Sequence, residues 1–188
     1  MFDVDRFIAD CRAALTESSP ELAIKELLAR AVSTPGEVEA ALGIPRQGEI
    51  AALHHSPELT IMKVVWVPGM SAPPHNHHLW ALIGLYGGQE DNTFYRREGN
   101  GIVAAGGRQL VVRDTELLGR EIIHSVTNPL REFTAAIHIY GGDFVRIPRS
   151  DWETGRERPF DMVRAKEIMA EANERWRAEA SRSVTPSR

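Results

Sequence analysis

Short runs of β-branched and aromatic residues, separated by glycine, proline and asparagine, fill the chain between residues 44 and 147. Many short strands with regular turn signals are typical of an all-β sandwich or barrel. The central part of the chain, residues 44–148, is therefore expected to form a single β barrel. The predicted strands are residues 59–67, 80–86, 93–97, 101–105, 110–113, 121–126, 133–140 and 143–147.

Helical patterns flank this central part. Apolar residues recur at spacings of three and four through residues 2–17, and two further helices are predicted between Pro20 and Gly43. Thr34 and Glu37 are expected to form a capping box at the start of the last of these. The expected organisation is an N-terminal helical extension (residues 1–43), the barrel, and a C-terminal helical tail (residues 149–188).

Composition excludes several classes of protein. A chain of 188 residues, 43% of them hydrophobic, suffices for one core. Its net charge of −4 and the dispersion of its arginines offer no basic surface, so nucleic acid is not an expected partner. Cys11 is the only cysteine, no apolar run approaches the roughly 20 residues needed to cross a bilayer, and the N-terminus lacks a signal-peptide pattern. We expect a cytoplasmic protein without a membrane partner.

Histidines lie after one predicted strand and within another. His75 and His77 stand two residues apart on extended backbone, so their side chains point to the same face. His124 offers a third imidazole on another strand, whereas His78 is expected to face away. Three neutral imidazoles that converge inside a barrel make a metal site with open coordination positions. We therefore predict that His75, His77 and His124 bind a metal.

The spacing of these residues resembles the cupin superfamily. Gly69 is followed after five residues by His75-x-His77, a Gly87-Gly88 pair follows, and His124 precedes Asn128 by four residues. The resemblance implies a mainly β fold, the cupin double-stranded β-helix or jelly-roll barrel. Most cupins add a Glu ligand, but Ala81 or Leu82 stands at its place here. The chain is thus similar to the cupins with three histidine ligands.

Among those, the chain resembles the cysteine dioxygenase family of thiol dioxygenases. The resemblance covers roughly residues 60–145 and includes the segment Ile137-His138-Ile139-Tyr140. It implies that Tyr140 donates a hydrogen bond to the reacting oxygen and that His138 orients the Tyr140 hydroxyl. The family has a serine where this chain has Ala136, and no cysteine is placed to crosslink with Tyr140.

The implied activity is that of a mononuclear non-haem iron dioxygenase acting on a small thiol or related small molecule, with Fe²⁺ as cofactor and dioxygen as second substrate. Imidazole ligands alone do not choose the metal. A Zn²⁺ or Ni²⁺ cupin with hydrolase, isomerase or lyase activity and a non-catalytic cupin that binds a small ligand remain alternatives. A homodimer is among the assemblies that the resemblance allows.

The group that would bind a substrate carboxylate is not evident. Members of the family use an Arg or Gln upstream of the metal strand, but residues 49–55 contain neither. Arg96 and Arg97, at the end of a predicted strand, are the candidates. Glu90 and Asp91 follow a glycine turn and are expected to be exposed.

Overall fold

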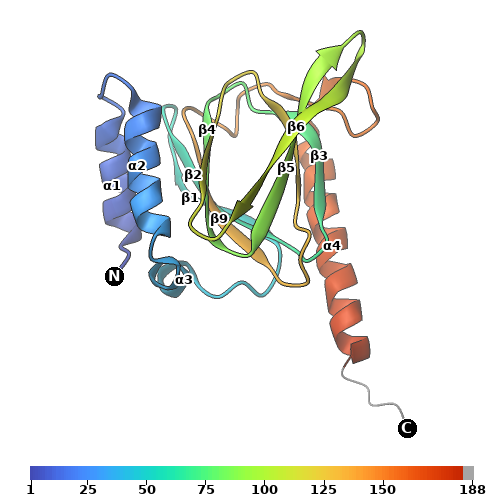
Figure 1. Ribbon diagram of the computed structural model, residues 1–188, viewed down its shortest axis with the longest axis horizontal. Helices are drawn as coiled ribbons and strands as arrows, with labels where there is room; N and C mark the ends of the chain where they lie inside the picture. The colour runs from blue at the N-terminus through green and yellow to red at the C-terminus, as the bar shows by residue number, and fades with distance from the viewer. Residues whose placement is uncertain (184–188) are drawn as a thin grey trace.

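Two antiparallel sheets form the centre of the protein, seen in a computed structural model that describes residues 1–183 (Figure 1). The strand orders are β1-β2-β9-β4-β7 and β11-β10-β3-β8-β5-β6, so strands distant in sequence lie side by side in each sheet. Two antiparallel sheets in this arrangement form a double-stranded β-helix, and the predicted fold class is confirmed. The first sheet consists of β1 (Glu49–His55), β2 (Thr60–Trp66), β9 (Thr134–Tyr140), β4 (Ala81–Gly87) and β7 (Thr115–Leu118). The second consists of β11 (Arg158–Pro159), β10 (Ser150–Asp151), β3 (Ser71–Asn76), β8 (Ile123–Thr127), β5 (Gln89–Glu98) and β6 (Gly101–Val111).

Three N-terminal helices cover one face of the first sheet: α1 (Val4–Ala14), α2 (Pro20–Val32) and α3 (Pro35–Leu42). Every residue of β9 is buried because the helices cover one of its faces and the barrel interior covers the other. Side chains alternate along a strand, so Ile137 and Ile139 join the cluster under the helices while Ala136 and Tyr140 join the interior cluster. The inward face of β9 is therefore available for a site.

The C-terminal helix α4 (Met162–Ser183) lies on the other side of the barrel from α1 and α2 (Figure 1). Asn173 connects α4 to Gly48, just before β1, through two hydrogen bonds. Its amide oxygen accepts from the Gly48 N–H at 2.7 Å and its amide nitrogen donates to the Gly48 carbonyl at 2.9 Å. Phe133 and Trp176 pack edge to face at 5.3 Å. Among residues 1–183, no helix has both the length and the apolar character needed to cross a membrane.

Several strand and cap predictions were wrong in detail. The predicted strand at residues 143–147 is a turn, in which the Ile147 N–H donates to the Asp143 carbonyl. Predicted strands 101–105 and 110–113 are one strand, β6, because Gly106 and Gly107 continue the ladder through a bulge instead of turning the chain. β1, β3, β7, β10 and β11 are not among the predicted strands, although His75 and His77 were expected on extended backbone.

The predicted capping box is also absent. The Thr34 hydroxyl donates back to the Ala31 carbonyl at 3.5 Å instead of accepting from the start of α3. Such local side-chain bonds compete with capping for the same hydroxyl. Asp3 does cap α1, where its carboxylate accepts from the Arg6 N–H at 3.0 Å.

Candidate metal centre

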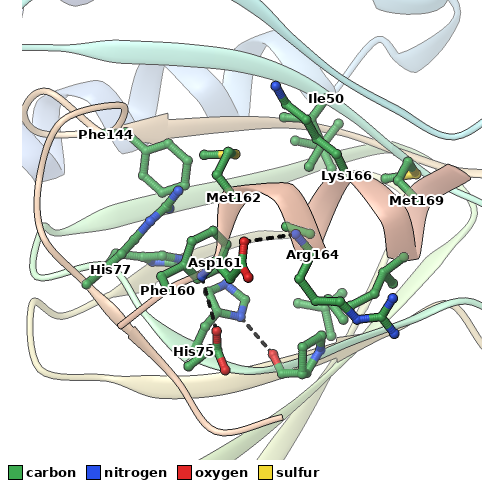
Figure 2. Close-up of a pocket in the computed structure, with 18 of the residues that line it drawn as sticks. Ile50, His75, His77, Phe144, Phe160, Asp161, Met162, Arg164, Lys166 and Met169 are labelled. Atoms are coloured by element: carbon green, nitrogen blue, oxygen red, sulfur yellow. Dashed lines mark hydrogen bonds between the residues drawn. The ribbon is translucent and has the colours of Figure 1, made fainter. Parts of the chain in front are cut away.

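The structure brings His75, His77 and His124 together inside the barrel. His75 lies on β3, His77 just beyond its end, and His124 on β8, where it pairs directly with His75 in the ladder. The ligand-type atoms of all three rings lie within 4.8 Å of one another. His77 and His124 are buried and His75 is half-buried. Figure 2 shows His75 and His77 at one end of the pocket.

Hydrogen bonds on the far side of two rings fix their orientation. His75 Nδ1 lies 2.9 Å from the Pro73 carbonyl, and His124 Nδ1 lies 2.7 Å from the Asn92 side-chain oxygen. Since both partners are acceptors, each Nδ1 carries the proton and each Nε2 presents a lone pair. Such partners are typical of metal-binding histidines, whose second nitrogen is held by an acceptor.

Burial keeps these imidazoles neutral, because it penalises the charged form. It lowers the pKa of His75 to about 4 and the pKa values of His77 and His124 well below the ordinary value. His77 Nε2 and His124 Nε2 are 3.4 Å apart. Two nitrogens bound to one ion at about 2.1 Å, with tetrahedral or octahedral angles, are separated by about 3.0–3.4 Å. The three rings fit a metal ion with open positions toward the pocket.

Glu90 lies behind this cluster and is fully buried, so the expectation that it would be exposed was wrong. Its carboxylate accepts from Trp66 Nε1 at 2.8 Å and from Asn92 Nδ2 at 2.9 Å. Burial raises the pKa of Glu90, but His138, Asn92 and Trp66 outweigh it and the net pKa is lowered. Asn92 therefore connects a buried anion to the His124 imidazole.

Tyr140 and His138 stand beside the imidazoles on β9. The His138 Nδ1 lies 3.2 Å from the Tyr140 hydroxyl, and the His138 Nε2 lies 3.6 Å from a Glu90 oxygen. The Tyr140 ring packs edge to face on the His77 ring at 5.1 Å. Burial raises the pKa of Tyr140, so its hydroxyl stays protonated. The Glu90 carboxylate, the His138 imidazole and the Tyr140 phenol are thus successive neighbours, and the last of them contacts the His77 ring.

A pocket of about 380 Å³ opens in front of the cluster, between the two sheets and the start of α4 (Figure 2). Its walls are mainly apolar, and the lining includes Ile50, Met62, Val64, Val126, Phe144 and Met169. Charged side chains, among them Arg149, Glu153 and Arg164, also line it, and an apolar pocket with polar groups at defined places is typical of small-molecule sites. The site can hold a metal ion and one small molecule in contact with it.

The predicted carboxylate binders lie elsewhere. Arg97 forms a bidentate pair with Glu157, and Arg96 is exposed. The arginines that line the pocket are Arg149, Arg158 and Arg164, and sequence reasoning missed all three. Arg149 follows the predicted strand 143–147 by two residues and directly precedes β10, in which Asp151 pairs with His75 of β3.

No protein-family model matches the chain. Similar solved structures include a cupin superfamily protein from Desulfitobacterium hafniense, with 19% identity over 55% of this chain and 87% of that chain and a TM-score of 0.44. An RmlC-like cupin from Methanocaldococcus jannaschii shares 10% identity over 53% of this chain and 84% of that one, with a TM-score of 0.45. The DMSP lyase DddQ from Ruegeria pomeroyi shares 17% identity over 55% and 50%, with a TM-score of 0.44. Identities and TM-scores this low carry no argument about function. The chemistry of the site is therefore inferred from the geometry of its own residues.

Proposed function

We propose that the protein is a mononuclear non-haem iron dioxygenase, similar to the cysteine dioxygenase family, that oxidises a small thiol to its sulfinate. The observation that carries the proposal is the meeting of three neutral imidazoles and a protonated phenol in one apolar pocket. A ferrous ion held by His75, His77 and His124 would supply the activation of dioxygen, both atoms of which are transferred to the thiol sulfur.

The ligand set favours an anionic substrate. Three neutral imidazoles leave the full charge of a divalent ion uncompensated, and their grouping on one side leaves positions open toward the pocket. A thiolate can therefore bind next to dioxygen. The apolar walls keep bulk water away from the reacting atoms, which strengthens every electrostatic interaction inside the site.

Tyr140 and His138 are proposed as catalytic residues. The protonated Tyr140 hydroxyl lies beside the His77 ring, where it can donate a hydrogen bond to the reacting oxygen. His138 orients that hydroxyl, and the Glu90 carboxylate faces the other nitrogen of His138. The family that this chain resembles has a serine where this chain has Ala136; here a Glu90 oxygen faces the His138 Nε2 at 3.6 Å, which is too long for a hydrogen bond.

Metal identity and oxygen consumption test the proposal together. Protein purified without an affinity tag is expected to contain iron by elemental analysis, and after anaerobic loading with Fe²⁺ to consume one dioxygen per sulfinate formed. The assay uses a panel of small thiols and follows oxygen uptake and product by mass spectrometry. Iron-loaded protein that consumes no oxygen with any thiol contradicts the dioxygenase.

The same three ligands suit Zn²⁺ and Ni²⁺. Zinc or nickel at full occupancy, with hydrolysis, isomerisation or elimination instead of oxygen uptake, would favour the other enzyme class. Tight binding of a small molecule with no turnover would favour a binding cupin.

A further inference from the structure

The pocket continues beyond the histidine cluster along the inner face of the first sheet. His138 on β9 pairs with Met62 on β2, and Met62 pairs with Ala52 on β1, so the three side chains point to the same face. All three residues line the pocket. Because neighbouring strands lie about 4.8 Å apart, the pocket extends about 10 Å across the sheet from β9 to β1.

We call the part of the pocket beyond His138 the apolar arm. Its walls come from β1, β2 and α4, and they consist of Ile50, Ala52, Met62, Val64, Ile168 and Met169. Figure 2 shows Ile50 and Met169 across the pocket from His77. None of the six side chains has an N–H or O–H group. A polar group placed in the arm would lose its hydrogen bonds to water without gaining others, whereas an alkyl or aromatic group has none to lose.

The charged residues of the pocket come from another part of the chain, residues 149–166. Arg149 stacks on the Phe144 and Phe160 rings, which lie beside the histidines, and Asp151 pairs with β3. Lys166 is exposed, so its ammonium group can stay in water while its methylenes cover apolar surface. The six residues of the apolar arm therefore bring no charge to it.

Apolar side chains at the opening of the pocket are exposed to water. Ile50 and Val145 are each 54% exposed and Met162 is 41% exposed, and all three line this one pocket. Single exposed apolar residues are ordinary, but a group of them around one opening is typical of a binding site. A ligand that extends from the histidine cluster into the arm would remove this surface from water.

The cavity is also large for a very short thiol. At about 30 Å³ for each water-sized group, its 380 Å³ hold about a dozen such groups, of which a metal ion and dioxygen take about three. A two-carbon thiol would leave most of the apolar arm to water, and apolar walls in contact with water are unfavourable. The size of the cavity therefore favours a ligand with a longer body.

We propose that the substrate is a thiol with an apolar body, an alkyl chain or an aromatic ring, that occupies the apolar arm while its sulfur binds at the histidine cluster. The inference rests on the proposed function, because the histidine cluster is what places the sulfur. It identifies Ile50 and Ala52, on the edge strand β1, as residues that select thiols with longer apolar groups over shorter ones.

Equilibrium binding without oxygen tests this assignment. The protein with its bound metal is titrated under nitrogen in a sealed cell with ethanethiol, propane-1-thiol, butane-1-thiol and pentane-1-thiol, and affinity is measured by calorimetry. In the wild type each added methylene should raise affinity by about three- to fourfold, the gain for moving one methylene out of water. The slope of affinity against chain length is the quantity compared among variants.

Two variants change the arm in opposite ways. Ile50→Thr keeps a β-branched side chain on the strand but removes apolar surface, so the gain from ethanethiol to pentane-1-thiol should fall by about three- to tenfold. Ala52→Phe fills part of the arm and should remove most of this gain.

Val111→Thr is the matched control, because Val111 is a β-branched residue on β6 that is 44% exposed and does not line the pocket. It should bind all four thiols as the wild type does. Ile50→Thr should keep the melting temperature and the metal content of the wild type, since Ile50 is an exposed residue outside the histidine cluster.

The outcomes are separable from those of the dioxygenase test. Equal wild-type affinity for the four thiols, no binding of any of them at millimolar concentration, or an unchanged slope in both Ile50→Thr and Ala52→Phe overturns the role of the apolar arm. An affinity that rises with chain length and falls in both variants, in a protein that consumes no oxygen, supports this assignment and contradicts only the proposed reaction. Oxidation of ethanethiol and pentane-1-thiol at the same rate with equal affinity does the reverse.

Discussion

At the scale of single residues, His75, His77 and His124 are proposed to hold a metal ion together. Replacing His75, His77 or His124 by Ala should remove most of the bound metal, because two neutral ligands cannot replace three. Elemental analysis measures the loss. His78→Asn is the matched control: His78 pairs with the Asn76 amide at 3.1 Å, and its backbone φ of 53° suits asparagine. Full metal content in all three alanine variants would show that the ligands are other residues.

The Tyr140 hydroxyl is proposed to act on the reaction rather than on metal affinity. Tyr140→Phe should therefore keep its metal and lower turnover by roughly 10- to 1000-fold, the range for one oriented polar group. Steady-state oxygen uptake with a confirmed substrate measures it. Tyr86→Phe is the control, since the buried Tyr86 hydroxyl has no hydrogen-bond partner within residues 1–183 and lies under the N-terminal helices. Loss of metal in Tyr140→Phe would make Tyr140 a structural residue.

Glu90 makes stability depend on pH in a defined direction. Its folded pKa is below the ordinary value of 4.5, so its contribution is complete above about pH 4.5 and is lost as the pH falls through the folded pKa. Glu90→Gln removes an acceptor for Trp66 or Asn92 and should lose about 1–3 kcal/mol at neutral pH. Urea unfolding should show a smaller further loss in the variant than in the wild type between about pH 6 and pH 3. Parallel losses would mean that Glu90 is protonated in the folded protein.

At the scale of elements, the fit of α2 on β4 depends on one glycine. A Cβ at Gly84 would lie 2.7 Å from Leu28 Cγ, whereas one at Gly87, on the same strand, would meet nothing nearer than 3.4 Å. Gly84→Ala is expected to push α2 away from the sheet and to lose about 1–3 kcal/mol, the typical cost of overpacking. Gly87→Ala should lose less. Chemical denaturation of both variants measures the difference, and equal stabilities would contradict this packing.

Elements with an apolar pattern were predictable from sequence, and elements held by pairing alone were not. β2 and β9 are mostly apolar runs and were located within a residue or two. β10 and β11 have two residues each and exist only because β3 offers an edge, so no local pattern could reveal them. The proximity of His75 and His77 could be predicted because the two residues are only two positions apart in the sequence. Glu90 and Arg149 were misjudged or missed because a charged residue in a polar segment reads as surface, and only the fold buries it.

At the scale of the whole molecule, the N-terminal helices and the pocket lie on opposite faces of the first sheet. Phe7, Ile24, Leu28 and Val32 pack against Ile61, Leu82, Ile137 and Ile139, while the inner face of the same strands meets the histidine cluster. The sheet thus separates a structural core from the pocket of the candidate metal centre. Any shift of β9 toward the helices would move Tyr140 and His138 with it.

Deletion of residues 1–43 should consequently expose the outer face of the sheet. Each buried side chain of the size of Leu or Phe contributes about 1.5–3 kcal/mol, so the loss of four is comparable to the ~5–15 kcal/mol stability of a whole domain. The truncated protein is expected to aggregate or to melt far below the full chain, as measured by size-exclusion chromatography and thermal denaturation. A graded comparison avoids relying on one drastic change: Leu28→Ala, fully buried on α2, should lose about 2–5 kcal/mol, and Leu22→Ala, 51% exposed on the same helix, should lose within about 0.5 kcal/mol. A soluble truncation as stable as the full chain, together with a neutral Leu28→Ala, would show that these helices do not form part of the core.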